Sequence, residues 1–123
     1  MIPKVNISGC KLSENYYRRD NTTWDIPTLI AHCKEKDYQV FDLPLAAIPL
    51  GYTPLVVKDF KSFIQHCKRV QEANLEYPII LDDEGSVADG YHRIAKAIMN
   101  GDTTIKAIRM EEMPAASNEI ENK

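Results

Sequence analysis

Long apolar runs are missing from this sequence. No stretch approaches the roughly 18 to 20 consecutive apolar residues that a membrane-spanning helix requires,. The first residues, from Met1 to Asn6, also lack the apolar core of a secretory signal peptide,. These absences predict a cytoplasmic protein that has no membrane partner.

Cysteine is scarce, and the number of cysteines is odd. The three cysteines, Cys10, Cys33 and Cys67, are too far apart for a zinc ribbon, and an odd count fits poorly with a disulfide framework,. The dipeptides His32-Cys33 and His66-Cys67 are poor bidentate metal sites, because neighbouring helical residues point about 100° apart. We therefore predict reduced cysteines and no structural metal, with Cys33 and Cys67 as core residues.

An excess of basic residues is also absent. The formal net charge is −3, whereas a free-standing DNA-binding protein is usually strongly basic because it neutralises phosphates. This balance argues against such a role and leaves a local basic patch open. With 123 residues, 44% hydrophobic and 27% charged, the chain is typical of one soluble domain with a single modest core.

The two ends carry little periodicity. We expect residues 1–22 to be loosely structured, residues 23–112 to form the domain, and residues 113–123 to fray. Within the first segment, the run Tyr16-Tyr17-Arg18-Arg19 is interpreted as a surface loop whose tyrosines lean on the core. Contact with a nucleic acid strand is the alternative.

Between these ends, helical and strand patterns alternate. Thr23 or Asp25 can cap a helix with an apolar stripe at Ile26, Leu29, Ile30 and Cys33,. A short strand is predicted over 38–43, and Leu55-Val56-Val57 is expected to continue the sheet. A clear amphipathic helix over 59–74 is predicted to bury one face against Ile79 and Ile80; that face comprises Phe60, Phe63, Ile64, Cys67 and Val70.

The remaining elements follow in close order. A buried strand over 78–81, a turn over 82–85 and a returning strand over 86–88 are predicted. A helix then starts after Gly90 and ends before Asn100-Gly101; its inward residues are Tyr91, Ile94, Ala95 and Ile98. A last strand is expected over 103–110. The chain is thus predicted to have an α+β fold, with a small mixed sheet packed against three to four helices.

The segment Asp89-Gly90-Tyr91-His92-Arg93 carries the clearest chemistry. The first turn of a helix has unpaired amide groups and a positive dipole end, which together favour an anion. Gly90 would let a ligand approach the backbone. Arg93 supplies a forked cationic donor for phosphate oxygens, and His92 can donate to phosphate or move a proton.

Asp89 has two interpretations. As a helix cap, its carboxylate would occupy the amides that a phosphate needs, and Tyr91, His92 and Arg93 would then be only structural or solvated. As a functional group, Asp89 would turn away and accept a proton or hold a phosphate-bound magnesium ion. The sequence leaves both orientations open.

The order of these pieces from Tyr38 to Met110 resembles the ParB/sulfiredoxin-like superfamily. The stretch 42–49, ending in Ile48-Pro49, is similar to the family's opening strand and Ile-Pro step, and 78–81 to its Pro-Ile strand after a helix. The stretch 87–97 is similar to the family's signature, in which an apolar strand is followed by glycine, two variable positions ending in arginine, and a helix of small residues.

The resemblance implies a nucleotide-binding domain in which Gly90, Tyr91, His92 and Arg93 lie at the phosphate. ATP or CTP with Mg²⁺ would be the ligand, and Asp89 and His92 are the candidate catalytic residues for nucleotide hydrolysis or phosphotransfer. Sulfiredoxin has cysteine where this chain has Tyr91, and a phenol cannot replace that thiolate nucleophile. The chain also ends too soon for the DNA-binding and dimerising regions of ParB.

Two other functions stay open. The same fold could be a non-catalytic module that binds a protein or DNA, or a ParB-like nuclease. For the nuclease, the sequence shows no clear carboxylate cluster, because Asp82, Asp83 and Glu84 lie on a turn at the far end of the strand from Asp89,. The choice of nucleotide, turnover, the phosphoryl acceptor and the oligomeric state are not determined by the sequence.

Overall fold

A computed structural model describes residues 1–8, 15–52, 54–116 and 118–119, and the described chain has an α+β fold. Cys10 lies outside the described residues. The elements in chain order are β1 (Tyr16–Arg19), β2 (Thr22–Asp25), α1 (Ile26–Lys36), β3 (Phe41–Pro44), the short 3-10 helix η2 (Leu45–Ala47), α2 (Phe60–Glu72), β4 (Ile79–Leu81), β5 (Val87–Asp89), α3 (Tyr91–Met99), β6 (Thr104–Arg109) and β7 (Asn118–Glu119).

The central sheet is mixed, with strand order β3-β6-β4-β5. Strand β6 runs antiparallel to β3 and parallel to β4, while β4 and β5 form an antiparallel hairpin. The turn predicted over 82–85 is present, although β5 begins at Val87 rather than at Ser86, and the backbone amide of Asp82 donates to the carbonyl of Ser86 at 2.7 Å. The mixed sheet that the sequence predicted is confirmed.

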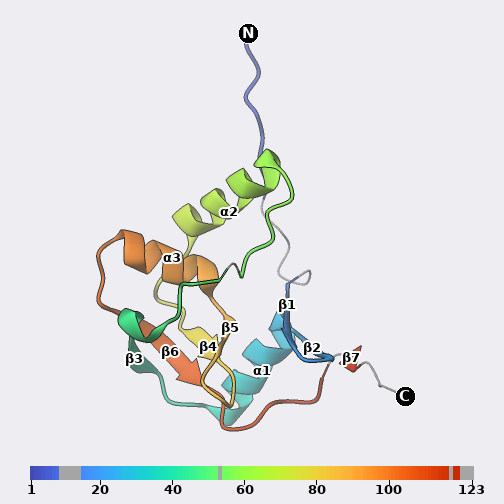
Figure 1. The fold of residues 1–123 in the computed structure, drawn as a ribbon, viewed down its shortest axis with the longest axis vertical. Helices are drawn as coiled ribbons and strands as arrows, with labels where there is room; N and C mark the ends of the chain where they lie inside the picture. The colour runs from blue at the N-terminus through green and yellow to red at the C-terminus, as the bar shows by residue number, and fades with distance from the viewer. Residues whose placement is uncertain (9–14, 53, 117, 120–123) are drawn as a thin grey trace.

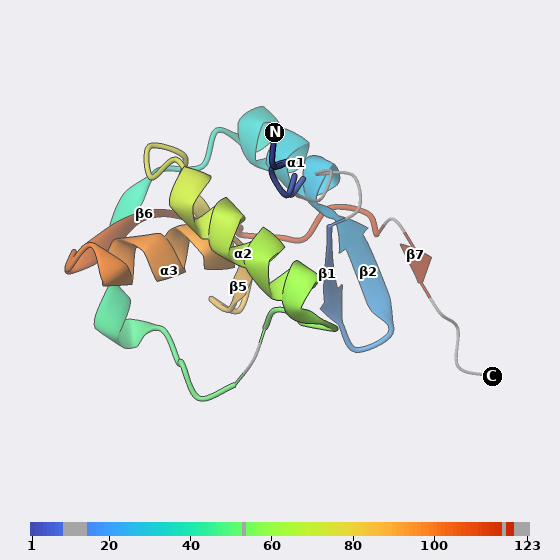
Figure 2. The ribbon, with the colours of Figure 1, turned by 90° about the horizontal axis from the view of Figure 1, so that it is seen from above.

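Helices cover both faces of this sheet (Figure 2). Because successive strand residues point to opposite faces, β4 contributes Ile79 and Leu81 to the core beneath α3, and Ile80 to the core beneath α1. The α3 side is completed by Ile94 and Ala97, and the α1 side by buried residues from four segments: Trp24, Ile26, Leu29, Cys33, Ala88 and Met110.

Helix α1 matches its prediction closely. Its capping residue is Asp25, whose carboxylate accepts a hydrogen bond from the amide of Thr28 at 2.8 Å. Leu29 and Cys33 are buried, as the apolar stripe predicted. Helix α3 starts after Gly90 and ends at Met99, but its buried residues are Ile94 and Ala97, while Ile98 is exposed.

Helix α2 forms as predicted, but its predicted packing is wrong. The helix lies on the outside of α3 rather than against the sheet (Figure 1). It has no buried residue among those described: Phe60 is 75% and Phe63 49% exposed, and Cys67 is exposed as well. Cys67 is therefore not a core residue. α3 is already buried against Ile79 and Leu81 and separates α2 from the strands.

A second sheet of three strands forms from the two ends of the chain, and this differs from the prediction for both ends. Residues 16–19, which lie in the segment 1–22 that was expected to be loosely structured, pair with residues 22–25 in a β-hairpin, and β7 pairs with β2 in the segment expected to fray. Side-chain contacts hold the hairpin in place: Tyr17 stacks on Trp24, and the indole of Trp24 donates to the carbonyl of Pro114 at 2.8 Å. The tyrosines therefore lie on a strand, not in a loop.

The segment between η2 and α2 also differs from its prediction. Leu55-Val56-Val57 forms no strand, and Val56 and Val57 are exposed. A prediction from β-branched residues alone is weak, because strand propensity reflects packing against neighbours that this segment lacks. Among the described residues, no helix is both long and apolar enough to cross a membrane.

Candidate functional site

The start of α3 is organised by backbone geometry rather than by a side-chain cap. Strand β5 ends at Asp89, and Gly90 takes the capping position with a φ angle of 121° and no capping hydrogen bond from a side chain. Asp89 therefore does not cap the helix, and the interpretation of Asp89 as a cap is wrong.

Asp89 instead pairs with Arg93 one turn later. The Arg93 guanidinium donates to Asp89 Oδ2 at 2.9 Å, and both side chains are mostly buried. Each charge neutralises the other. Because the carboxylate of Asp89 is bonded to Arg93, it does not bind the first amides of the helix. One nitrogen of the Arg93 guanidinium is therefore engaged by an internal partner, a contact that the sequence did not predict.

Gly90 is required by packing. An added Cβ would lie 2.4 Å from Cγ2 and 2.8 Å from Cβ of Ile79, a residue with no exposed surface. The positive φ angle also disfavours any other residue. These two constraints explain the glycine without a ligand, so the predicted role of Gly90 in ligand access is not needed to account for it.

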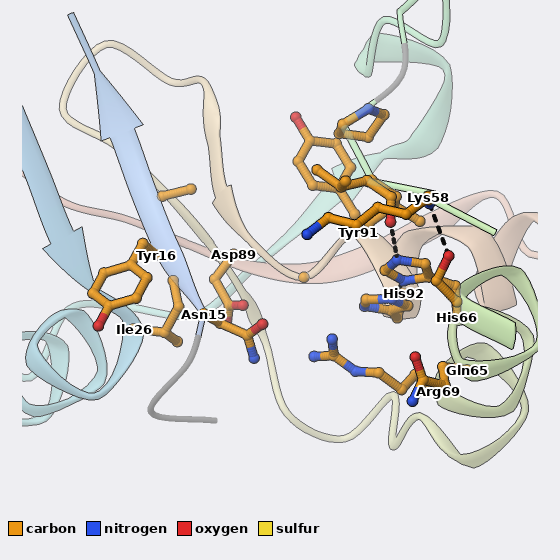
Figure 3. A pocket seen from close by; sticks show the side chains of 16 residues that line it. Asn15, Tyr16, Ile26, Lys58, Gln65, His66, Arg69, Asp89, Tyr91 and His92 are labelled. Carbon is orange, nitrogen blue, oxygen red and sulfur yellow. Dashed lines mark hydrogen bonds between the residues drawn. The ribbon is translucent and has the colours of Figure 1, made fainter. Parts of the chain in front are cut away.

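A cavity of about 550 Å³ opens beside Gly90. It lies between the β1–α1 region, the segment before α2, helix α2 itself and the start of α3 (Figure 3). Its lining includes four of the predicted site residues, Asp89, Gly90, Tyr91 and His92. Arg93 lines a neighbouring hollow of about 480 Å³, which shares Arg69, Asp89, Gly90 and His92 with the first.

Helix α2 supplies most of the remaining polar lining. Ser62, Gln65, His66 and Arg69 all face the cavity, and Lys58 precedes the helix. In Figure 3 the Arg69 side chain extends from α2 into the space between His92 and Asp89. Among the described residues, no carboxylate pairs with Lys58 or Arg69. These two cations therefore make one side of the cavity electropositive.

His66 and His92 meet at this side of the cavity. Nδ1 of His66 lies 2.8 Å from Nε2 of His92, and the two rings are nearly parallel, with centroids 5.1 Å apart. Burial, reinforced by the charges of Arg69, His66 and Arg93, lowers the pKa of His92 to about 4. His92 is therefore neutral near pH 7, so it can donate and accept hydrogen bonds.

Tyr91 is the first residue of α3 and also lines the cavity. Its hydroxyl hydrogen-bonds that of Tyr52, and the two rings meet edge to face with centroids 6.3 Å apart. Burial, with the neighbouring Tyr52 hydroxyl, raises the pKa of Tyr91. The phenol thus remains protonated and serves as a hydrogen-bonding group.

The three residues that sequence reasoning missed are Lys58, His66 and Arg69. A detectable signal was present, because Ser62, Gln65, His66 and Arg69 recur at the three- and four-residue spacing of one helix face,. The apolar stripe of α2 instead predicted that this face of the helix is buried. The exposure of that stripe and the position of α2 over α3 depend on tertiary packing, which the sequence pattern does not encode.

The acidic turn and the two described cysteines, Cys33 and Cys67, lie apart from the cavity lining. Asp82 accepts hydrogen bonds from Tyr17 and Asp83 from Arg19. Burial raises the pKa of the Cys33 thiol to about 11, which makes it a poor nucleophile or metal ligand. Within the described ranges, no group of three or more His, Cys, Asp or Glu side chains could hold a metal ion.

Comparison with known proteins adds no relative: the chain matches no protein-family model, no curated protein and no solved structure.

Proposed function

We propose that this chain is a nucleoside phosphate-binding domain of the ParB/sulfiredoxin type, with the phosphate held in the cavity beside the start of α3. The observation that carries this proposal is the convergence of Lys58, Arg69 and the amino-terminal end of α3 on one cavity. The only carboxylate among its described lining residues, Asp89, is already neutralised by Arg93. Positive potential without a resident anion favours an anionic ligand.

The geometry favours different roles for Arg69 and Arg93 from those that the sequence predicted. Arg69 takes the role of phosphate donor that was predicted for Arg93, since Arg69 extends into the cavity and has no acidic partner among the described residues. Arg93 supports the site indirectly, by holding Asp89 away from the first amides of α3. ATP or CTP with Mg²⁺ remains the ligand that we propose.

For nucleotide hydrolysis or phosphotransfer, His92 is the better candidate for moving a proton. Its ring is neutral near pH 7 and lines the cavity, whereas Asp89 is paired with a cation. A reductase reaction of the sulfiredoxin type is not proposed, because Tyr91 offers a phenol of raised pKa where that reaction needs a thiolate,.

The test is a titration of ATP, CTP and GTP with Mg²⁺, followed by thermal unfolding. A ligand at a hundredfold its Kd should stabilise the protein by about 2.7 kcal/mol. Arg69→Ala should weaken binding by about tenfold or more, because it removes a charge-assisted hydrogen bond. Arg109→Ala is the matched control, since Arg109 contacts the carbonyl of Asp83 away from the cavity. Equal affinity in wild type and Arg69→Ala would move the site elsewhere.

A specific observation also favours a protein-interaction module. Six large apolar side chains are exposed between residues 50 and 63, namely Leu50, Tyr52, Val56, Val57, Phe60 and Phe63. Phe60 and Phe63 stack with centroids 6.1 Å apart on the uncovered face of α2. A stacked aromatic pair that is exposed to solvent is a feature that binding surfaces share. Under this function no nucleotide would stabilise the wild-type chain, and Phe60→Ser would abolish binding to a partner.

A further inference from the structure

The histidine pair of the cavity has a defined order of donors and acceptors. His66 belongs to α2 and His92 to α3, and the two partly buried rings lie nearly parallel, 13° apart. His66 makes a second hydrogen bond, with its Nε2 lying 2.9 Å from the backbone carbonyl of Val56. The result is a chain of three groups that links the segment before α2 to both helices.

Only one proton arrangement satisfies this chain when both rings are neutral. A carbonyl oxygen has no proton to give, so Nε2 of His66 must donate to Val56. Nδ1 of a neutral His66 is then an acceptor, and Nε2 of His92 must carry the proton that lies between the rings. Nδ1 of His92 is left with a lone pair. In the part of the chain that the structure describes, no hydrogen bond occupies that atom.

The charges around the pair favour this neutral state. Arg69 on α2 and Arg93 on α3 both disfavour an additional positive charge on His92. Lys58, from the segment before α2, lines the same cavity. Asp89 on β5 is held by Arg93, and Tyr91 remains a neutral phenol. A positive charge on His92 would therefore face neighbouring cations until an anion enters the cavity.

We infer that His66 is a positioning residue that fixes the tautomer of His92, so that Nδ1 of His92 presents its lone pair for accepting a proton at the candidate site. The inference rests on the proposed function for the source of that proton, a water or hydroxyl beside a bound phosphate. When Nδ1 accepts the proton, the proton on Nε2 of His92 can shift to Nδ1 of His66. The positive charge then sits on His66, whose Nε2 keeps its own proton and still donates it in a hydrogen bond to the Val56 carbonyl.

The inference is tested by nitrogen NMR of the histidine rings in the full chain near pH 7. We expect His92 to be the tautomer protonated at Nε2 in wild type. His66→Gln should keep this tautomer, because a glutamine can accept from His92 through its oxygen and donate to Val56 through its nitrogen. His66→Leu should lose the preference. Amide spectra of each variant show whether the fold is intact.

Two results would overturn the inference. One is a wild-type His92 protonated at Nδ1, and the other is an unchanged tautomer in a folded His66→Leu variant. If His66→Leu does not fold, wild type and His66→Gln still decide the tautomer. The proposed function is judged separately by the nucleotide titration, so a chain that binds no nucleotide yet has the Nε2 tautomer refutes that function and leaves the positioning role standing.

Discussion

At the scale of single residues, Gly90 shows how a motif position can serve the fold first. Its φ angle of 121° and its approach to Ile79 both exclude a side chain. The glycine therefore sets the direction in which the chain leaves β5 and enters α3. That direction brings Tyr91 and His92 to the cavity wall, and the site depends on the glycine through this geometry.

Gly90→Ala should accordingly be strongly destabilising. Backbone strain and overpacking against Ile79 each cost on the order of 1–3 kcal/mol. Gly101→Ala is the matched control, because Gly101 also has a positive φ angle of 81° but nothing lies near its added Cβ. Denaturant unfolding should show a clearly larger loss for Gly90→Ala. Equal losses would mean that strain alone, without the Ile79 contact, explains the glycine.

The lowered pKa of His92 predicts a specific dependence of stability on pH. An unfolded histidine binds a proton near pH 6.5, whereas His92 in the folded chain resists protonation down to about pH 4,. The unfolded state therefore binds more protons in this window, so stability falls as the pH falls, by at most about 1.4 kcal/mol per pH unit. His92→Gln should have a shallower profile between pH 6.5 and 4. Parallel profiles in unfolding experiments would contradict the assignment.

At the scale of elements, side-chain hydrogen bonds connect the β1–β2 hairpin to the acidic turn between β4 and β5. The Tyr17 hydroxyl donates to Asp82 Oδ2 at 2.5 Å, and Asp82 is only 1% exposed. Although burial opposes its charge, hydrogen bonds from Tyr17 and from the amides of Ser86 and Glu84 lower the pKa of Asp82. Its carboxylate thus stays charged near pH 7 and needs these donors.

Tyr17→Phe should therefore cost about 1–3 kcal/mol, the loss typical when a buried charged acceptor loses one partner. Tyr16→Phe provides the control, because Tyr16 is the next residue on the same strand and is exposed to solvent. It should change stability by less than about 0.5 kcal/mol. The two variants are compared by urea unfolding, and similar losses would show that the hydroxyl of Tyr17 does not fasten the hairpin.

The apolar face of α2 should contribute little to the free chain. Phe63→Ala removes a side chain that is 49% exposed, so we expect a loss below about 1 kcal/mol. Leu29→Ala is the comparison, because Leu29 has no exposed surface and a buried leucine typically costs 2–5 kcal/mol to truncate. A large loss in Phe63→Ala alone would mean that α2 is packed more tightly than its exposure indicates.

At the scale of the whole molecule, local signals predicted the elements better than their contacts. Asp25 as a cap, the turn at 82–85 and the end of α3 at Asn100 each depend on a few neighbouring residues, and each was found. The burial of α2 and the pairing of β7 with β2 depend on distant segments and were missed. The cavity lining shows the same difference: the neighbouring residues 89–92 of the predicted site line one cavity, whereas Arg69, which comes from another helix, was not predicted to lie there.

The order of strands has a consequence for synthesis on the ribosome. Strand β6 is the last strand of the central sheet to be made, yet it lies between β3 and β4. Until residues 104–109 emerge, β3 has no neighbour in the sheet, and β4 can pair only with β5. The α3 core, which includes Ile105 and Ala107, must wait as well. A nascent chain therefore exposes an incomplete sheet edge from the synthesis of β3 until β6 emerges, and such an edge can pair wrongly or be bound by chaperones,.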